Sequence, residues 1–171
     1  MATKYEAVGS GIEDMTTSQN YDTKTVKDVL GVSSTKATKG NKAITVSPVT
    51  INPNSEWAKF IDTAIERQYE LSQLEKEFLF VKSYKLISGN PVAWKQKAVV
   101  VPTDWAIGNA DLQAGVEVNL IGEATYGTLT GTGSNLSFTP ETTPPASSEI
   151  TYVAGDAKRS DFIMYFITET A

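Results

Sequence analysis

The stretch Asn54-Ser-Glu-Trp-Ala-Lys-Phe-Ile-Asp-Thr-Ala-Ile-Glu-Arg-Gln-Tyr69 decides the fold, because its apolar residues follow the period of an α-helix. Asn54 or Ser55 suits the N-cap, and Glu56 follows in the first turn, where a negative charge is favourable. The spacing predicts a helix over about residues 55–69. Its apolar stripe, which we expect to pack on the core, consists of Trp57, Phe60, Ile61, Ala64 and Ile65.

On both sides of this helix the chain alternates apolar and polar residues or is rich in Thr, Gly and Ser, as strands and turns are. We expect strands at about 12–18, 43–51, 75–87, 94–101, 114–125, 150–153 and 162–167. Pro48 indicates an edge or a bulge, and Pro102 is expected to end its strand. The predicted fold is mainly β with one α-helix, in which roughly seven or eight strands form two packed antiparallel sheets, as a sandwich or barrel, flanked by that helix.

The chain length of 171 residues suits a single domain with a real hydrophobic core. Within that domain, residues 1–11 are small and polar, which predicts a flexible N-terminal arm. Residues 32–40 have little to bury and predict an exposed loop. Residues 126–148 are rich in Gly, Thr and Pro and predict a long surface loop, within which 136–138 is a candidate short strand.

The composition excludes several kinds of chemistry. The chain has no Cys and no His, so disulfides, thiolate catalysis, the commonest metal ligands and the usual general base are all missing. We therefore expect no cofactor, no metal site and no enzymatic activity. Asp and Glu number 20 against 15 Lys and Arg, and this net charge of -5 disfavours non-specific binding to DNA or anionic membranes. The start of the sequence lacks the apolar core of a signal peptide, and no apolar run is long enough to span a membrane, so we expect a cytoplasmic product.

Two local patterns that resemble catalytic or nucleotide-binding motifs fail on closer inspection. Gly127-Thr-Leu-Thr-Gly-Thr-Gly133 lacks the Gly-Lys-Ser/Thr of a phosphate-binding loop and opens no helix, so it indicates a turn. Glu117 and Glu123 are expected on one face of a strand, but six strand steps separate them by roughly 20 Å, too far for a glycosidase pair. They are better explained as a row of exposed acids.

Several strands carry apolar residues on both faces, which implies that something covers the second face. Helix and second sheet together can supply that cover. A neighbouring subunit is the other explanation, and the number of two-faced strands exceeds what one helix can cover. The candidate inter-subunit residues are Leu79, Val81, Ile163, Tyr165 and Ile167.

The order of segments resembles a known family. A polar arm leads into Gly11-Ile-Glu-Asp-Met15, and a segment ending Val29-Leu-Gly31 precedes a Ser/Thr/Lys loop. Ile44-Thr-Val-Ser-Pro-Val49, a Pro-Asn turn, the single helix and Phe78-Leu-Phe-Val-Lys-Ser-Tyr84 follow. This order resembles the major tail proteins, or tail tube proteins, of long-tailed bacteriophages, whose fold is shared by the tubes of contractile tails and type VI secretion systems.

The resemblance implies a structural virion protein with two packed sheets and one flanking helix. Six subunits would join their sheets into a β-barrel ring, and rings would stack into a hollow tail tube that conducts DNA during ejection. Implied partners are further copies of the chain, the tape measure, tail terminator and distal tail proteins, and double-stranded DNA in passage without specific binding, but no membrane. The virion tail is the implied location, after synthesis in the bacterial cytoplasm. An acidic lumen would repel the DNA backbone, and Glu117 and Glu123 are the candidate lumen residues.

Two other functions remain open at the level of sequence. A β-sandwich binding or adhesion module would be a monomer with an exposed aromatic platform near Trp94 or Trp105. A head decoration or tail terminator protein would form a closed oligomer that does not polymerise.

Overall fold

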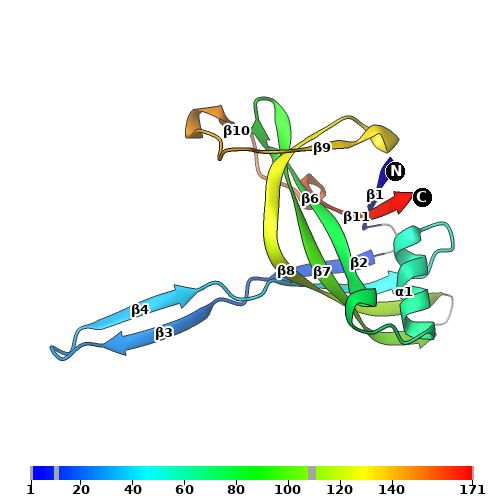
Figure 1. Cartoon of the computed structure of the whole chain (residues 1–171), viewed down its shortest axis with the longest axis horizontal. Helices are drawn as coiled ribbons and strands as arrows, with labels where there is room; N and C mark the ends of the chain where they lie inside the picture. The colour runs from blue at the N-terminus through cyan, green and yellow to red at the C-terminus, as the bar shows by residue number, and fades with distance from the viewer. Residues whose placement is uncertain (1, 10–11, 108–110, 171) are drawn as a thin grey trace.

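The computed structural model describes residues 2–9, 12–107 and 111–170 (Figure 1). Within these ranges the chain forms one α-helix, α1 (Glu56–Glu66), and four short 3-10 helices, of which η1 (Leu71–Leu74) lies near α1 in sequence. The strands are β1 (Ala2–Ala7), β2 (Ile12–Ser18), β3 (Asp22–Lys27), β4 (Ser33–Thr38), β5 (Ala43–Thr50), β6 (Glu75–Ile87), β7 (Asn90–Ile107), β8 (Leu112–Thr130), β9 (Ser137–Pro140), β10 (Ile150–Tyr152) and β11 (Phe162–Thr170).

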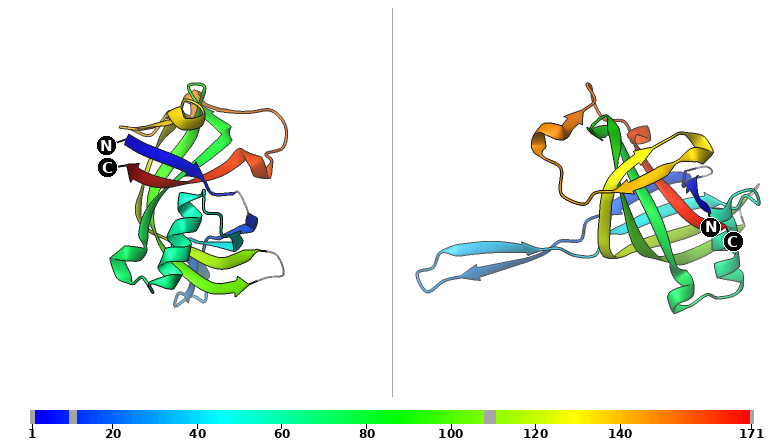
Figure 2. Two further views of the ribbon diagram at one scale, coloured as in Figure 1. Left: turned by 90° about the vertical axis from the view of Figure 1, so that its right-hand side faces the viewer. Right: turned by 45° about the horizontal axis from the view of Figure 1, so that its top comes forward.

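The strands form two antiparallel sheets, and the prediction of a mainly β fold with one α-helix is confirmed. The larger sheet has the order β1-β11-β6-β7-β8-β5-β2, with β10 beside β6 and β9 beside β8. It curves so strongly that its two halves face each other and enclose the main core (Figures 1 and 2). Both packed layers thus belong to one sheet, and the second sheet is the ribbon β3–β4, which projects from the body.

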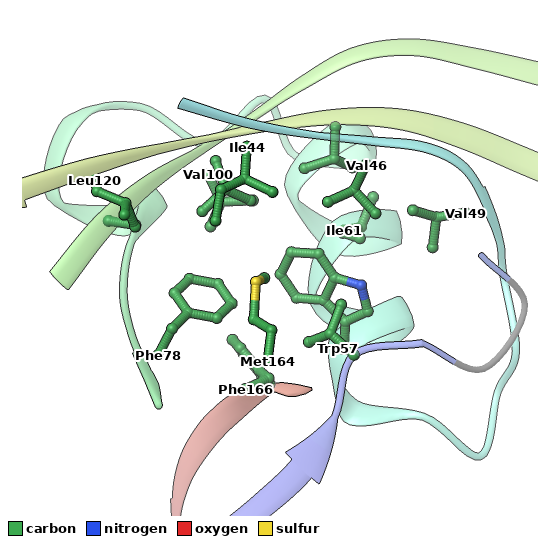
Figure 3. Packing of buried hydrophobic residues seen from close by; sticks show 14 of the residues in the cluster. Ile44, Val46, Val49, Trp57, Ile61, Phe78, Val100, Leu120, Met164 and Phe166 are labelled. Carbon is green, nitrogen blue, oxygen red and sulfur yellow. The ribbon is translucent and has the colours of Figure 1, made fainter. Parts of the chain in front are cut away.

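The main core lies between the two halves of the curved sheet and against α1 (Figure 3). Trp57 of α1 is central to it, with its ring 5.6 Å from Phe78 and 5.3 Å from Phe166 between centroids. Burial of such a large side chain stabilises the fold by about 1.5–3 kcal/mol. The other fully buried residues of this core include Ile44 and Val46 of β5, Val100 of β7, Val116 and Val118 of β8, Phe80 of β6 and Met164 of β11.

Helix α1 confirms the predicted stripe. Trp57, Ile61 and Ala64 are buried, and Phe60 and Ile65 pack on the core while partly exposed. Ser55 caps the helix, since its hydroxyl oxygen accepts a hydrogen bond from the Ala58 N–H at 3.1 Å. The helix ends at Glu66, three residues earlier than predicted, because the backbone turns into the left-handed region at Gln68 (φ 49°).

The N-terminal segment corrects one prediction. Residues 2–7, expected as a flexible arm, form β1 and pair with β11 from Ala2↔Thr170 to Ala7↔Tyr165. The next residue, Val8, is buried and donates its N–H to the Met164 carbonyl at 2.7 Å. The prediction was wrong because backbone hydrogen bonds to a strand distant in sequence hold these residues, and such bonds do not require apolar side chains. Residues 10 and 11 of the predicted arm lie outside the described residues.

Two predicted loops also contain strands. Residues 33–38, expected within an exposed loop, form β4 and pair with β3. Residues 126–130, expected in the long surface loop, belong to β8, and residues 137–140 form β9 on its edge. β9 begins one residue later and ends two residues later than the candidate strand at 136–138. Pro102, expected to end its strand, does not do so, because β7 continues to Ile107. The pairing register shifts between Pro102 and Asp104, and a proline, which has no N–H, is tolerated at such an irregularity.

Candidate assembly surfaces

The β3–β4 ribbon buries nothing in its own chain. Every residue of both strands is exposed, although they pair in regular antiparallel register from Asp22↔Thr38 to Lys27↔Ser33. The views of Figures 1 and 2 agree that the ribbon extends away from the body. An isolated two-stranded ribbon is at best marginally stable in water. The side chains of this ribbon therefore add little burial to its stability.

The tip of the ribbon presents apolar side chains on a defined turn. Val29 and Leu30 are 102% and 84% exposed, and Val32 is also exposed. The Asp28 carboxylate accepts hydrogen bonds from the N–H groups of Leu30 and Val32, both at 2.9 Å. These bonds hold the turn in one conformation, with its apolar side chains exposed.

The base of the ribbon is held by a close backbone approach. The side-chain amide of Asn20 donates to the Asn41 carbonyl at 2.9 Å. At the same place, a Cβ atom added at Gly40 would lie 1.4 Å from the backbone carbonyl oxygen of Asn20. Only glycine fits there, so the two chain segments entering the ribbon are closely joined.

The ribbon differs from the body in charge. Residues 22–38 carry three lysines and two aspartates, a net charge of +1. With the whole chain at -5, the remaining residues carry -6. The ribbon and the body therefore carry net charges of opposite sign.

The second apolar face of the sheet is partly covered by the chain itself. Leu79 and Val81, predicted as inter-subunit residues, are 0% and 3% exposed in a second core that includes Ala93 and Leu129. Leu136, just before β9, and Phe138 of β9 pack against this core. Part of the cover therefore comes from within the subunit.

Three predicted inter-subunit residues remain accessible on this second face. Ile163, Tyr165 and Ile167 of β11 are half-buried, as is Tyr5, whose ring meets that of Tyr165 edge-on at 6.5 Å. Burial raises the pKa of the Tyr165 phenol above its ordinary 10.0. Contact of these side chains with a neighbouring subunit stays a prediction.

The two predicted lumen glutamates both lie on β8 but in different settings. Glu117 alternates with the buried Val116 and Val118 and therefore points to the face opposite the main core. Glu123 is exposed and follows an irregularity at Gly122, whose carbonyl accepts a hydrogen bond from the Gln96 side chain at 3.1 Å. This irregularity interrupts the alternation on which the expectation of one shared face rested.

The terminal strands of the large sheet are β1 and β2, each paired on one side in the part of the chain that the structure describes. Such edges are templates for pairing with another chain. The seam between them leaves a cavity lined by Val8, Met15, Thr17 and Phe162, with Lys158 and Arg159 at its border.

The end of β7 lies at the end of the molecule opposite the ribbon (Figure 1). It carries a further exposed apolar region. Trp105 of β7 is 48% exposed, and Val101 and Ile107 of the same strand are exposed as well. Sequence reasoning singled out Trp105 and Trp94 as candidate platform residues. Trp94 is less available, because it stacks on Phe80 at 5.2 Å and lies beneath the Lys82 ammonium at 5.5 Å.

The tip residues Val29, Leu30 and Val32 were not recognised from sequence as a contact surface. The available signal was a Val-Leu pair placed between Asp28 and Gly31 in a stretch otherwise made of Thr, Ser and Lys. An apolar pair next to a turn usually indicates the end of a strand that packs on a core, so it does not by itself indicate an exposed surface. Only the tertiary structure shows that these residues are exposed and far from the body.

The described residues form no group of three Asp or Glu side chains arranged to hold a metal ion. None of the helices in the described ranges is both long and apolar enough to cross a membrane. No protein-family model, curated protein or solved structure matches the chain.

Proposed function

We propose that this chain is a structural virion protein that assembles into stacked hexameric rings and forms the tube of a phage tail, a conduit for DNA. The observation that carries the proposal is the β3–β4 ribbon, which is regular, fully exposed and tipped with Val29 and Leu30. An element of this kind suits a protein whose fold is completed by other copies of itself. The proposed location is the virion tail, with the tape measure, terminator and distal tail proteins as further partners.

Two other features support ring formation. The edge strands β1 and β2 leave backbone groups that can extend the sheet from one subunit to the next. The half-buried Ile163, Tyr165 and Ile167 lie beside β1 on β11, where a neighbouring sheet would complete their burial. In addition, the charge of -6 outside the ribbon suits a wall along which DNA slides without binding.

Imaging of the concentrated protein tests the proposal. We expect negative-stain electron microscopy to show rings or tubes, and we expect a variant with residues 22–38 replaced by a short Gly-Ser linker to stay unpolymerised. The linker variant should keep the thermal unfolding midpoint of the parent, because the ribbon buries nothing in the body. A parent chain that stays monomeric at all concentrations, with or without the other tail proteins, would refute the proposal.

The lumen assignment is tested by charge reversal. Glu117→Lys and Glu123→Lys together should permit assembly but slow DNA ejection, since a basic lumen would hold the phosphate backbone. Glu141→Lys, a half-exposed acid just beyond β9, is the matched control. Ejection at the parental rate from particles with both substitutions would show that these residues do not line the lumen.

A binding or adhesion module is the second candidate, favoured by the half-exposed indole of Trp105. It requires a monomer that binds glycans through this ring, and binding that is lost on Trp105→Ala. Light scattering after size exclusion, combined with a glycan array, separates this function from assembly. A closed oligomer of constant size at every concentration would instead indicate a decoration or terminator protein.

A further inference from the structure

We infer that the ribbon tip of one copy docks into a cavity at the far end of a second copy, beside α1 and the end of β7. This inference rests on the proposed assembly and deepens it by naming the two surfaces that meet. The occupant of the cavity is the turn that carries Val29 and Leu30.

The cavity has the apolar lining that such a tip requires. It measures about 300 Å³ and lies where the last turn of α1, η1 and β7 meet. Tyr69 on its wall is fixed by a bond from its N–H to the Ala64 carbonyl at 3.0 Å. The apolar lining residues are Ile65, Tyr69, Leu74, Val101, Pro102 and Trp105.

Charge favours the same pairing. Asp104 lines the cavity, and residues 62–76 beside it carry four acids against one arginine and one lysine, a net charge of -2. The tip turn is flanked by Lys27, and the ribbon as a whole has a charge of +1. The carboxylate of Asp28, the acid nearest the tip, already accepts two hydrogen bonds from the turn. Opposite potentials thus steer the ribbon toward this end of a second copy.

Other cavities fit the tip less well. The seam cavity beside Phe162 is bordered by Lys158 and Arg159, which have the same sign as the ribbon. The cavities at the ribbon's own base include Lys39, Lys42 and Lys82. The cavity at β9 includes Glu141 and Glu149, but its lining is otherwise mainly Thr and Pro, with Ile87 as its one large apolar side chain. The cavity beside α1 is therefore the one that combines a large apolar lining with an acid.

The positions of the two surfaces determine the kind of assembly. The ribbon and α1 lie at opposite ends of the longest axis of the molecule (Figure 1). A contact between different patches at opposite ends is heterologous, so each docked copy leaves one free tip and one free cavity. Repetition produces an open axial polymer, as stacking of rings requires.

Cysteine cross-linking tests the contact directly, because the natural chain contains no Cys. Leu30→Cys places a thiol on the tip and Gln68→Cys places one on the exposed wall of the cavity. In the assembled double variant, oxidation with diamide should join the two thiols into a disulfide and give a ladder of covalent oligomers. The matched control combines Leu30→Cys with Ser160→Cys, an exposed site at the seam cavity.

Each single-cysteine variant is oxidised alongside, so that tip-to-tip dimers are recognised as such. A ladder from Leu30→Cys with Gln68→Cys, and dimers alone from the control pair, supports the inference. Assembled protein that gives no ladder with Gln68→Cys, or an equal ladder with Ser160→Cys, overturns it.

A second measurement separates this inference from the proposed function. Leu30→Asp should raise the critical concentration for assembly at least about tenfold, since it places a charge in an apolar, acidic cavity. The control Val153→Asp makes a like change at another exposed apolar residue and should leave the critical concentration unchanged. A parent chain that never assembles refutes the proposed function, whereas assembly of Leu30→Asp at the parental concentration refutes only the docking of the tip.

Discussion

Strands pair in antiparallel fashion both in the body around α1 and in the β3–β4 ribbon, but the side chains of the two regions have different roles. In the body, Trp57, Phe78 and Phe166 converge on one another and are buried. In the ribbon, every side chain is exposed, and the register rests on backbone bonds and contacts such as Thr25–Thr35, whose hydroxyl oxygens are 2.9 Å apart. Packing therefore sets the stability of the body, while the ribbon contributes reach and contact. Substitutions in the two regions should separate folding from assembly.

The largest effect is expected from a cavity in the main core. Phe78→Ala should lower the free energy of unfolding by about 3–5 kcal/mol, because the ring is fully buried among aromatic neighbours. Val26→Ala in the ribbon should change it by less than about 0.5 kcal/mol. Urea denaturation followed by tryptophan fluorescence measures both. Equal losses would show that the ribbon is part of the cooperative fold and break the contrast.

A smaller effect is expected where β9 meets β8. A Cβ atom at Gly127 would lie 2.1 Å from the Thr139 carbonyl oxygen, so Gly127→Ala must push β9 from the sheet and loosen the cover of Leu79. We expect a loss of about 1–3 kcal/mol in urea denaturation. Gly9→Ala is the control, since a Cβ there meets nothing within 4 Å. A neutral Gly127→Ala would mean that β9 contributes little to the second core.

The helix cap gives the next effect in size. Ser55 caps α1, donates its hydroxyl to the Glu6 carboxylate of β1 and thereby joins the helix to the edge of the sheet. Ser55→Ala should cost about 1 kcal/mol in thermal or urea unfolding. Ser72→Ala, on exposed η1, should cost less than about 0.5 kcal/mol. If both variants match the parent, the cap does not stabilise the body.

The smallest effect concerns one exposed ion pair on α1. The Lys59 ammonium, 2.8 Å from the Glu56 carboxylate, holds the pKa of Glu56 below its usual 4.5 through a hydrogen bond and charge attraction. Because this pKa is lowered on folding, the stability it contributes is present above pH 4.5 and is lost as the pH falls through the folded value. Lys59→Met should raise the Glu56 pKa toward 4.5 in an NMR titration, with almost no change in stability. An unchanged Glu56 pKa would show that the pair does not persist in solution.

The predictability of the fold differs between its parts for a physical reason. Helix α1 and the strand 75–87 were predictable, because the period of their apolar residues indicates from the local sequence which side chains are buried. Strands β1 and β4 were not, because their residues bury little and pair through backbone groups that every sequence carries. The same holds for β7 beyond Pro102, where an irregular register made the proline acceptable.

The candidate assembly surfaces were predictable in kind more than in detail. Two-faced strands indicated that something covers Leu79 and Val81, yet the cover proved to include Leu136 and Phe138 of the same chain. The expected shared face of Glu117 and Glu123 depended on a regular strand, and the irregularity at Gly122 interrupts it. Irregularities of this kind arise from the pairing of two strands and leave no clear mark in either sequence alone.

The sequence by itself determined a mainly β chain with one capped amphipathic helix, no Cys or His chemistry and an acidic net charge, because these follow from residue type and local period. The tertiary structure alone decided that one curved sheet encloses the core, that β1 closes on β11, and that Val29 and Leu30 stand far from the body. These features depend on which distant segments pair. The energy of pairing comes from both strands together, so the local sequence of one strand does not identify its partner.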